Sequence, residues 1–548
     1  MERDYGGLFE RRAVNIALFR KQILFSEEAQ KKLLKGFETV ARAVGSTLGP
    51  KGRNVAVDPI PDYDITPTVL HDGVSVARSI NLTDRFEDMG ARLIKGAALK
   101  TNEKAGDGTT TATILAHSIF SEALKVVAAG ANPMTVKAQI EESLKFVLSQ
   151  LNLLKKDVKK NAEIEQVATI SSASPEIGKL VSEALIKVGT DGAITVEEGK
   201  SLETTVEYKK GMEIDRGYLS PYFVTNQDRA EAIIENPLIL MTDKKLNYAY
   251  ELLPFLEKLV KSGKKDLVIF AGEVIEEALA ALVVNKLRGA INVVAIQSPA
   301  FGDRRIDELQ DMAAFTGGYP ILADEGRQIE SVEIKQLGRA ERIIADRDKT
   351  VIINGAGSRL ALKKRADDLR EQLKVANTDY DREIKEDRLA NLSGKVAIIH
   401  VGAATEVELK EKKERVIDAV AASKAAMEEG IVAGGEITLY NIACDNTEGF
   451  SGTGGDILRE ALKKPFKVLL ENSGYDYAES LQRLSGKSYP WGLDVIDGEA
   501  KDLIKAGIID PVKVTRFALE NAVSIATMAI TTNTLITDIP PEKKEQPL

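Results

Sequence analysis

The sequence predicts a multidomain protein of the mixed α/β class, in which mostly helical ends enclose an α/β middle. Its 548 residues exceed the length of one ordinary domain, for which about 100–200 residues is typical. Segments with the three- and four-residue spacing of helices dominate both ends, whereas short β-branched runs flank a helical run near the middle. We therefore expect similar end segments to enclose a domain of different architecture.

The N-terminal part is expected to contain long helices interrupted by a short pair of strands. Residues 27–45 place apolar side chains on one helical face, and the Gly- and Pro-containing loop 46–52 stops that helix. Gly130, followed by Asn132 and Pro133, marks the end of a later helix. The expected helices and strands of this part are 27–45, 54–58, 68–72, 86–104 and 109–129.

The middle of the chain combines strands with helices. Residues 193–199 and 204–214 are expected to form strands, with Gly211 interrupting the second. The runs 267–272 and 293–298 flank a helical segment, which is the pattern of a β-α-β unit. The other expected elements are helices at 274–286, 360–390 and 407–430 and a strand at 396–402.

Composition argues against several classes of protein. Lys and Arg number 74 against 83 Asp and Glu, and the net charge of −9 disfavours duplex nucleic acid and anionic membranes as main partners. Cys444 is the one cysteine and the three histidines are far apart, which argues against disulfides, zinc sites and Ser-His-Asp hydrolysis. The acidic N-terminal stretch does not resemble a signal peptide, and no apolar run reaches the roughly 18 residues of a membrane helix. We therefore expect a cytoplasmic protein.

The segment 105–113, AGDGTTTAT, carries the clearest chemical signal. Gly106 and Gly108 permit a tight turn that a ligand can approach closely, and three threonines then open a helix whose free N–H groups favour an anion. Asp107, between the glycines, would hold Mg²⁺ that bridges phosphates. The structural alternative is a tight turn followed by a threonine-capped helix.

Four further segments have both a functional and a plainer structural interpretation. The loop 47–54 either contacts phosphate or is a helix-terminating turn with solvated cations, and Asp72 is either a functional acid or part of an Asp-Gly turn. Asp418, followed by Gly434 and Gly435, suggests a helix-borne acid above a backbone bend; the alternative is a solvated acid. A helical stripe that usually faces a core consists of Leu279, Leu282, Val283 and Lys286.

Together and in this order, these segments resemble the group I chaperonins, the GroEL family of ATP-driven protein-folding rings. The resemblance extends from about Gln22 to Pro540. The stretches that carry it are TLGPKGRNV (47–55), DGVSVAR (72–78), AGDGTTTAT (105–113), KVGTDGAITVEEG (187–199), RGYLSPYF (216–223), LVVNKLRG (282–289), FGDRR (301–305), VGAATEVELKEKK (401–413) and GIIDPVKVTR (507–516).

The resemblance implies a chaperonin fold in which five segments make three domains. These are a mostly helical equatorial domain that binds ATP, a small intermediate hinge domain and an α/β apical domain. The expected segments are 1–153 and 429–548 (equatorial), 154–209 and 397–428 (intermediate) and 210–396 (apical). The resemblance also implies self-assembly into seven-membered rings, two of them stacked, with a small co-chaperonin ring as partner.

The implied activity is ATP hydrolysis coupled to the capture and release of unfolded polypeptides, with Mg²⁺ as cofactor and K⁺ as a further candidate cation. Asp72 and Asp418 match the acids that position and activate the attacking water, and Asp107 matches the Mg²⁺ ligand. The positions that match the nucleotide site are Thr47, Leu48, Gly49, Pro50, His71, Gly106, Asp107, Gly108, Thr109, Thr110, Thr111, Ile170, Ser171, Gly434, Gly435, Asp494, Val495, Ile508 and Asp510.

The implied binding surface for unfolded polypeptides and the co-chaperonin lies in the middle of the chain. Because a non-native chain has no fixed shape, its recognition must be largely apolar. The resemblance therefore predicts that the stripe on the helix at 276–284 is exposed rather than turned to the core. The matching positions are Tyr218, Tyr222, Phe223, Leu253, Leu256, Leu279, Val283 and Val284.

Four positions depart from the family pattern. His71 stands where the family usually has a Lys near the phosphates, so charge compensation there is weaker. Glu436 stands in place of the third Gly after Val432-Ala433, and Asp494 in place of the usual Asn of the base contact. Lys395 replaces one Gly of a double Gly near the apical exit.

Two other functions are compatible with part of the sequence. A degenerate chaperonin-like protein with weak or no ATPase is left open by His71 and Glu436, although Asp72, Asp107 and Asp418 are intact. An actin-like small-molecule kinase would share the Asp-Gly-Thr-Thr loop, but it would need a second Asp-Gly-x-Gly-type loop in a following α/β half.

Overall fold

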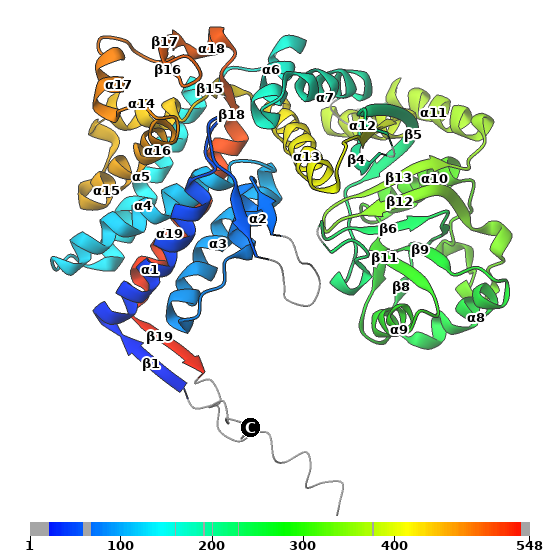
Figure 1. The fold of residues 1–548 in the computed structure, drawn as a ribbon. Coiled ribbons are helices and arrows are strands. Elements are labelled where there is room, and N and C mark those ends of the chain that lie inside the picture. Colours follow the sequence, from blue (N-terminus) through cyan, green and yellow to red (C-terminus); the bar gives the residue numbers. More distant parts are fainter. Residues whose placement is uncertain are drawn as a thin grey trace, which may run out of the picture. The chain divides into compact units, whose positions relative to one another are not determined.

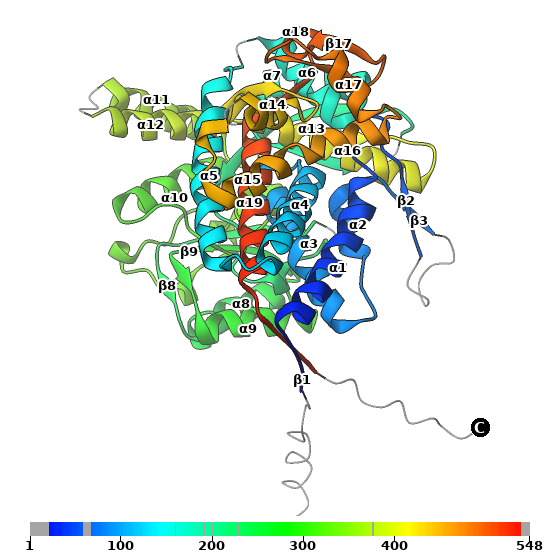
Figure 2. The same ribbon diagram turned by 90° about the vertical axis from the view of Figure 1, so that its left-hand side faces the viewer.

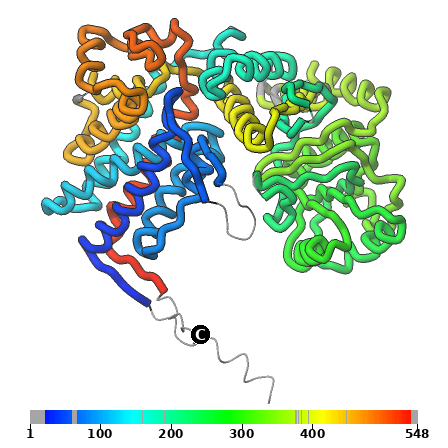
Figure 3. Tube along the Cα trace, in the orientation of Figure 1, coloured from blue at the N-terminus to red at the C-terminus, as the bar shows by residue number. Residues whose placement is uncertain are grey.

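The computed structural model describes residues 21–58, 67–158, 160–189, 192–199, 201–227, 229–374, 378–445 and 447–538. The chain forms two compact units, of which the first is Met1–Ser182 with Ala404–Leu548 and the second is Glu183–Ala403. Figure 3 shows the early and late parts of the chain, blue and red, within the same unit. The two ends of the sequence, which share a helical pattern, therefore fold together.

Long helices form the core of the first unit. α1 (Ser26–Gly45), α3 (Arg85–Ala105), α4 (Thr109–Ala128) and α19 (Val512–Thr531) lie side by side in Figures 1 and 2. Apolar residues at three- and four-residue intervals give each helix one buried face. These faces meet in one continuous cluster of buried side chains.

Shorter helices and two-stranded ribbons surround this core. The elements are β1 (Lys21–Phe25), β2 (Val55–Val57), β3 (Thr68–Leu70), α2 (Gly73–Ser79), α5 (Pro133–Leu154), α6 (Asn161–Ser172), α7 (Pro175–Val188, continuing into the second unit), α13 (Glu406–Glu429), β15 (Ile431–Ala433), α14 (Ile437–Asp445), α15 (Gly452–Leu462), α16 (Lys464–Asn472), α17 (Tyr477–Arg483), β16 (Trp491–Asp494), β17 (Glu499–Asp502), α18 (Leu503–Ala506), β18 (Ile509–Pro511) and β19 (Thr534–Asp538). Antiparallel pairs join β1 to β19, β2 to β3, β15 to β18 and β16 to β17.

The second unit is built on a nine-stranded mixed sheet. Its strand order is β11-β9-β7-β12-β13-β5-β14-β4, with β6 also paired to β12. The strands are β4 (Ile194–Glu198), β5 (Thr205–Ile214), β6 (Ala232–Glu235), β7 (Leu238–Met241), β9 (Asp266–Ala271), β11 (Asn292–Gln297), β12 (Gly338–Ala345), β13 (Thr350–Gly355) and β14 (Lys395–Val401). β7, β9 and β11 run parallel and are buried along almost their whole length, which explains their continuous apolar sequences.

Helices and short strands complete the second unit. They are η2 (Pro221–Phe223), β8 (Lys245–Leu246), η3 (Ala249–Glu251), α8 (Leu253–Lys261), β10 (Glu273–Val274), α9 (Glu276–Leu287), α10 (Asp303–Thr316), α11 (Arg359–Lys374) and α12 (Asp379–Ser393). Because β9 and β11 are parallel neighbours joined through α9, the β-α-β unit expected from the sequence is confirmed.

The expectation that Gly211 interrupts a strand is wrong. Gly211 lies inside β5, opposite Ile353 of β13. A Cβ atom at this position would collide with the side chain of Val396 on β14. Glycine here permits close packing between adjacent strands instead of ending one.

The structure does not test the expected division into three domains or the expectation for the N-terminal stretch. The division into equatorial, intermediate and apical domains stays a prediction, since the chain separates into two units and not three. The acidic N-terminal stretch lies outside the described residues. Within the described ranges, none of the helices has the length and apolar character needed to cross a membrane.

α1 and α3 cross closely at two glycines. A Cβ atom on Gly36 would collide with the backbone of α3 at Glu87 and Ala91, and one on Gly90 would collide with the backbone of α1 at Leu33. Because the obstacles are backbone atoms, side-chain movement cannot relieve them.

We expect Gly36→Ala to lower the free energy of unfolding by about 1–3 kcal/mol in denaturant titrations. Gly96→Ala is the matched control on α3, because its Cβ would meet only the side chain of Ile525, at 3.6 Å. The better helix propensity of alanine should leave that variant unchanged or more stable by up to about 1 kcal/mol. Equal stabilities of the parent and Gly36→Ala would contradict the close crossing.

Candidate functional site

The turn between α3 and α4 depends on two glycines. Gly106 and Gly108 have φ values of 70° and 81°, a left-handed conformation that other residues avoid. A Cβ atom at Gly106 would collide with Ala421 on α13, and one at Gly108 would lie 2.6 Å from Cγ1 of Val514 on α19. The glycines thus let the turn, with Asp107 at its centre, lie close to two other helices.

Asp107 is held by one hydrogen bond from its own turn and one from α6. Its Oδ1 accepts the backbone N–H of Gly108 at 2.6 Å, and its Oδ2 accepts the hydroxyl of Ser171 at 2.9 Å. Burial nevertheless raises the pKa of the Asp107 carboxyl, and the negative charge of Asp72 raises it further. The structure therefore brings together Asp107, Ser171 and Asp72, three residues predicted for the site.

Asp72 caps the N-terminus of α2. Its Oδ1 accepts the backbone N–H of Val74 at 3.1 Å, and its Oδ2 accepts that of Ser75 at 2.8 Å. The next residue, Gly73, lies against α4, since a Cβ atom there would be 2.5 Å from Oγ1 of Thr110. The start of α2 and the start of α4 are thus in direct contact.

His71 does not replace the positive charge of the family's usual Lys. Its Nδ1 lies 2.9 Å from Oδ1 of Asn54. Burial, reinforced by the nearby positive charge of Arg415, lowers the pKa of His71 below its usual value of 6.5. The imidazole is therefore mainly neutral at pH 7.

The loop that begins at Thr47 also reaches the start of α4. Oγ1 of Thr47 donates to the carbonyl of Val44 at 2.8 Å and lies 3.4 Å from Oγ1 of Thr110. Nδ2 of Asn472 donates to the carbonyl of Leu48 at 3.1 Å, which fixes the loop from its other side. The predicted loop residues therefore lie beside the predicted threonines.

Asp418 lies on α13, one turn before the contact between that helix and the glycine turn. Ala421, which faces Gly106, is three residues further along the same helical face. Burial is the main cause that raises the pKa of Asp418 well above its usual value, and the charges of Asp107 and Asp72 add to it.

Glu436 adds a fourth carboxylate that sequence reasoning recorded only as a missing glycine. Its side chain accepts a hydrogen bond from Oγ1 of Thr111, in the first turn of α4. Burial raises the pKa of Glu436 to about 7, with a contribution from the charge of Asp107. No sequence signal identifies this contact, because the two partners are separated by 325 positions.

Asp510 on β18 is the fifth carboxylate. It accepts the backbone N–H of Glu436, and a Cβ atom at Gly434 would lie 2.9 Å from its Oδ1. Burial raises the pKa of Asp510 well above its usual value, and the charges of Glu436 and Asp107 raise it further.

These five carboxylates form an acidic cluster, defined as Asp72, Asp107, Asp418, Glu436 and Asp510. In the part of the chain that the structure describes, no Lys or Arg forms an ion pair with any of them. The described residues also contain no group of three His, Cys, Asp or Glu side chains arranged to complete a metal site. Mg²⁺ fits this donor set, because it typically takes one or two carboxylates and completes its shell with phosphate and water oxygens.

The remaining predicted nucleotide-site residues differ in their placement. Ile170 is partly exposed next to Ser171, and Ile508 packs with Leu48 against the small core cluster that contains Val495. Asp494 forms an ion pair with Lys501 at 2.9 Å. Val495 is buried, so its side chain serves packing in this structure.

The predicted apolar surface of the second unit is correct only in part. The expectation of exposure is wrong for Phe223, which is 0% exposed, and for Leu256, which is 6% exposed; both belong to the core. Tyr218, Leu279 and Val283 are half-buried against the same core. The expectation that the stripe on α9 is exposed is therefore wrong, because Leu282 is also fully buried and the stripe faces the core.

Part of the predicted surface is exposed, and further apolar residues join it. Tyr222, Leu253 and Val284 are 64%, 44% and 42% exposed. The sequence did not predict three further exposed residues, which are Tyr248 just before η3, Tyr250 on η3 and Leu287 at the end of the contacting helix α9. The rings of Tyr248 and Tyr250 stack with centroids 5.4 Å apart. We call Tyr222, Tyr248, Tyr250, Leu253, Val284 and Leu287 the apolar surface.

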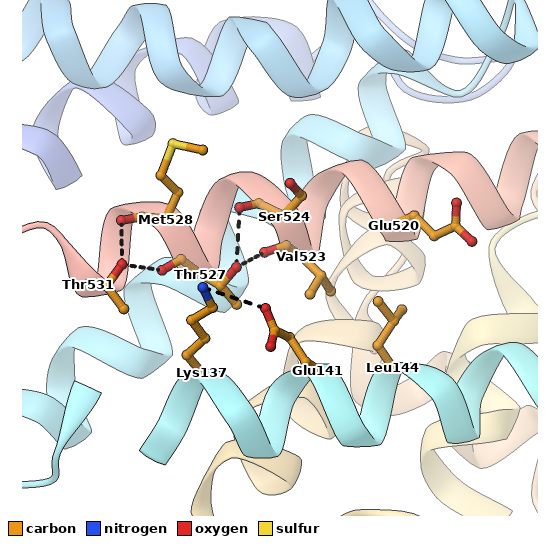
Figure 4. Close-up of a pocket in the computed structure, with 9 residues that line it drawn as sticks. All are labelled: Lys137, Glu141, Leu144, Glu520, Val523, Ser524, Thr527, Met528 and Thr531. Atoms are coloured by element: carbon orange, nitrogen blue, oxygen red, sulfur yellow. Dashed lines mark hydrogen bonds and ion pairs between the residues drawn. The ribbon is translucent and has the colours of Figure 1, made fainter. Parts of the chain in front are cut away.

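A groove of about 320 Å³ lies elsewhere in the first unit, between α5 and α19. Figure 4 shows Lys137, Glu141 and Leu144 projecting from α5 toward α19, where Val523 and Thr527 also line the groove. None of the predicted site residues lines this groove. The acidic cluster and the groove are therefore separate features.

Comparisons with known proteins agree with this architecture. The family model of the TCP-1/cpn60 chaperonin family matches residues 40–540. The chaperonin gp146 from the bacteriophage EL 2 (Pseudomonas aeruginosa), in the presence of ATP-BeFx, is similar in two crystal forms, with TM-scores of 0.69 and 0.61. In both, the identity is 22%, and the match covers 94% of this chain and 99% of that chain. The chaperonin fold expected from the sequence is confirmed.

We expect Asp418→Asn to stabilise the ligand-free protein more at pH 8 than at pH 4, near the usual pKa of an unfolded Asp. An unfolded carboxyl ionises near its usual pKa, whereas the raised pKa of folded Asp418 means that stability is lost as the pH rises through the folded value. Removing the charge should raise the melting temperature at pH 8 by about 2–4 °C, the shift that ~1 kcal/mol produces in a large domain.

Asp456→Asn is the control for this experiment, because Asp456 is a surface carboxylate 3.2 Å from Arg459. It should change the melting temperature little at either pH. An Asp418→Asn variant no more stable than the parent at pH 8 would contradict the electrostatic account of the cluster.

Proposed function

Because the chain belongs to the TCP-1/cpn60 chaperonin family, we propose that it is an ATP-hydrolysing chaperone of the group I type. The observation that carries the proposal is the convergence of Asp72, Asp107 and Asp418 on the glycine turn before α4. Family membership supports a chaperone role, and the acidic cluster supports Mg²⁺-dependent ATP hydrolysis as its energy source.

The start of α4 suits the phosphates. Its first backbone N–H groups and the hydroxyls of Thr109 and Thr110 would bind phosphate oxygens, assisted by the loop at Thr47. The hydroxyl of Thr111, which the sequence also assigned to this role, donates to Glu436 instead. Asp107 would hold Mg²⁺, oriented by its hydrogen bond from Ser171. When bound, the ion supplies positive charge that compensates the phosphates, a role that neutral His71 does not fill.

Asp72 and Asp418 would have different roles toward the attacking water: one orients it and the other accepts its proton. Both carboxylate oxygens of Asp72 accept backbone N–H groups of α2, which hold the side chain in place. Asp72 would therefore orient the attacking water. Asp418, buried on α13 near Asp107 and Asp72, would take the proton from the water. Ile170, Gly435, Ile508 and Asp510 would lie around the base and ribose.

The apolar surface suits unfolded polypeptides. Its side chains come from α9 and η3, which contact each other, from η2, which contacts α9, and from α8, which contacts η3, so a bound segment could bury several of them together. Full burial of one aliphatic side chain contributes about 1.5–3 kcal/mol. Seven subunits in a ring, with a second ring stacked behind, would present seven such surfaces to one client. A co-chaperonin ring would compete for the same surface.

The alternative functions fit less well. A chaperonin-like protein without ATPase would not need Asp72, Asp107 and Asp418 to converge, although neutral His71 and the added Glu436 point toward slow turnover. An actin-like kinase is disfavoured by the family match over residues 40–540.

We expect Asp418→Ala to bind MgATP but to hydrolyse it about 10²–10⁴-fold more slowly, which is the usual contribution of a general base. Binding is measured by calorimetry and turnover by phosphate release. Glu406→Ala, in the first turn of the same helix and exposed, is the matched control and should hydrolyse ATP at the parental rate. Equal turnover of Asp418→Ala and the parent would remove Asp418 from the mechanism.

We expect the double variant Leu253→Ser with Val284→Ser to capture a denatured model protein several-fold less efficiently in the absence of nucleotide. The measurement is suppression of the aggregation of that model protein. Leu360→Ser is the control, since Leu360 is strongly exposed on α11, outside the apolar surface. A similar loss in both variants would argue that capture does not depend on the apolar surface.

A further inference from the structure

Glu436 occupies a backbone conformation that glycine would adopt more easily. Its φ is 61°, directly after Gly435 at 63°, and a non-glycine residue in this region is uncommon. The strain is held by contacts on two sides. The backbone N–H of Glu436 donates to Asp510 on β18, and its carboxylate accepts the hydroxyl of Thr111 on α4. Glu436 therefore connects the turn after β15 to the first turn of α4.

The hydrogen bond to Glu436 uses the only proton that the Thr111 side chain can donate. A threonine hydroxyl carries one O–H, and an ionised carboxylate can only accept. While Thr111 donates to Glu436, it cannot donate to a phosphate oxygen. The carboxylate also adds a negative charge beside Asp107 and Asp510, where an anionic ligand would enter.

We propose that Glu436 is a positioning residue that weakens nucleotide binding, because it competes with a phosphate oxygen for the hydroxyl proton of Thr111. The inference rests on the proposed function, in which the start of α4 binds phosphate. A phosphate oxygen must therefore displace the Glu436 carboxylate from the Thr111 hydroxyl before it can accept that hydrogen bond.

Glu436→Gln separates this role from simple packing. Glutamine has nearly the same size, but its side-chain N–H₂ can donate to the oxygen of Thr111 and leave the hydroxyl proton for phosphate. We expect this variant to bind MgATP about tenfold more tightly than the parent in calorimetry. Glu436→Gly, which relieves the positive φ and removes the carboxylate, should shift affinity in the same direction.

Thr111→Val provides the readout that a merely structural role would not move. In the parent, the hydroxyl is already committed to Glu436, so its removal should change the affinity for MgATP by less than about threefold. In the Glu436→Gln background, the freed hydroxyl contacts phosphate, and its removal should cost about tenfold. The two substitutions are therefore expected to be strongly non-additive.

The outcomes distinguish this inference from the proposed function. A parent that binds MgATP, together with Glu436→Gln and Glu436→Gly variants that bind no more tightly, would overturn the inference alone. Equal effects of Thr111→Val in the two backgrounds would also overturn it. A parent that binds no MgATP would overturn both the inference and the nucleotide site. Thermal unfolding of each variant identifies any that does not fold, and the remaining glutamine or glycine variant then decides the result.

Discussion

The concentration of negative charge at the acidic cluster of the first unit is the constraint on which the rest of the structure depends. The acidic cluster brings five carboxylates together without an ion-paired Lys or Arg among the described residues. Mutual repulsion among crowded charges is stronger than in water, because protein atoms replace solvent around them. A cation held between the cluster and a polyphosphate would relieve this repulsion, so the arrangement favours a ligand that brings its own positive ion.

The helical core maintains this unfavourable arrangement. Gly106 and Gly108 let the glycine turn that contains Asp107 approach α13 and α19. The pairing of β15 with β18 brings Glu436 and Asp510 near Asp107. The contributing segments come from both ends of the chain, which explains why the first unit is discontinuous in sequence. The second unit is built differently, because its parallel strands form an apolar core. Part of the apolar surface on its helices remains exposed.

Local patterns in the sequence predict most elements, and the family resemblance predicts four of the five acids. Periodicity identifies α1, α3, α4 and the β-α-β unit, because each buries one continuous face. The resemblance to the chaperonins points to Asp72, Asp107, Asp418 and Asp510, whereas on local grounds the clearest signal was Asp107 between its two glycines. The bond between Thr111 and Glu436 could not be predicted, because only tertiary folding brings distant segments together. The burial of Phe223 and Leu256 was missed for a related reason, since the resemblance names positions but not their depth.

The location of a bound ion and nucleotide tests the central claim most directly. The measurement is a crystal structure of the protein with a non-hydrolysable ATP analogue and Mn²⁺, in which the anomalous signal marks the ion. The account predicts an anomalous peak beside the carboxylate of Asp107 and phosphates at the start of α4. A nucleotide bound elsewhere, for example in the groove between α5 and α19, or an ion away from the acidic cluster, would contradict it.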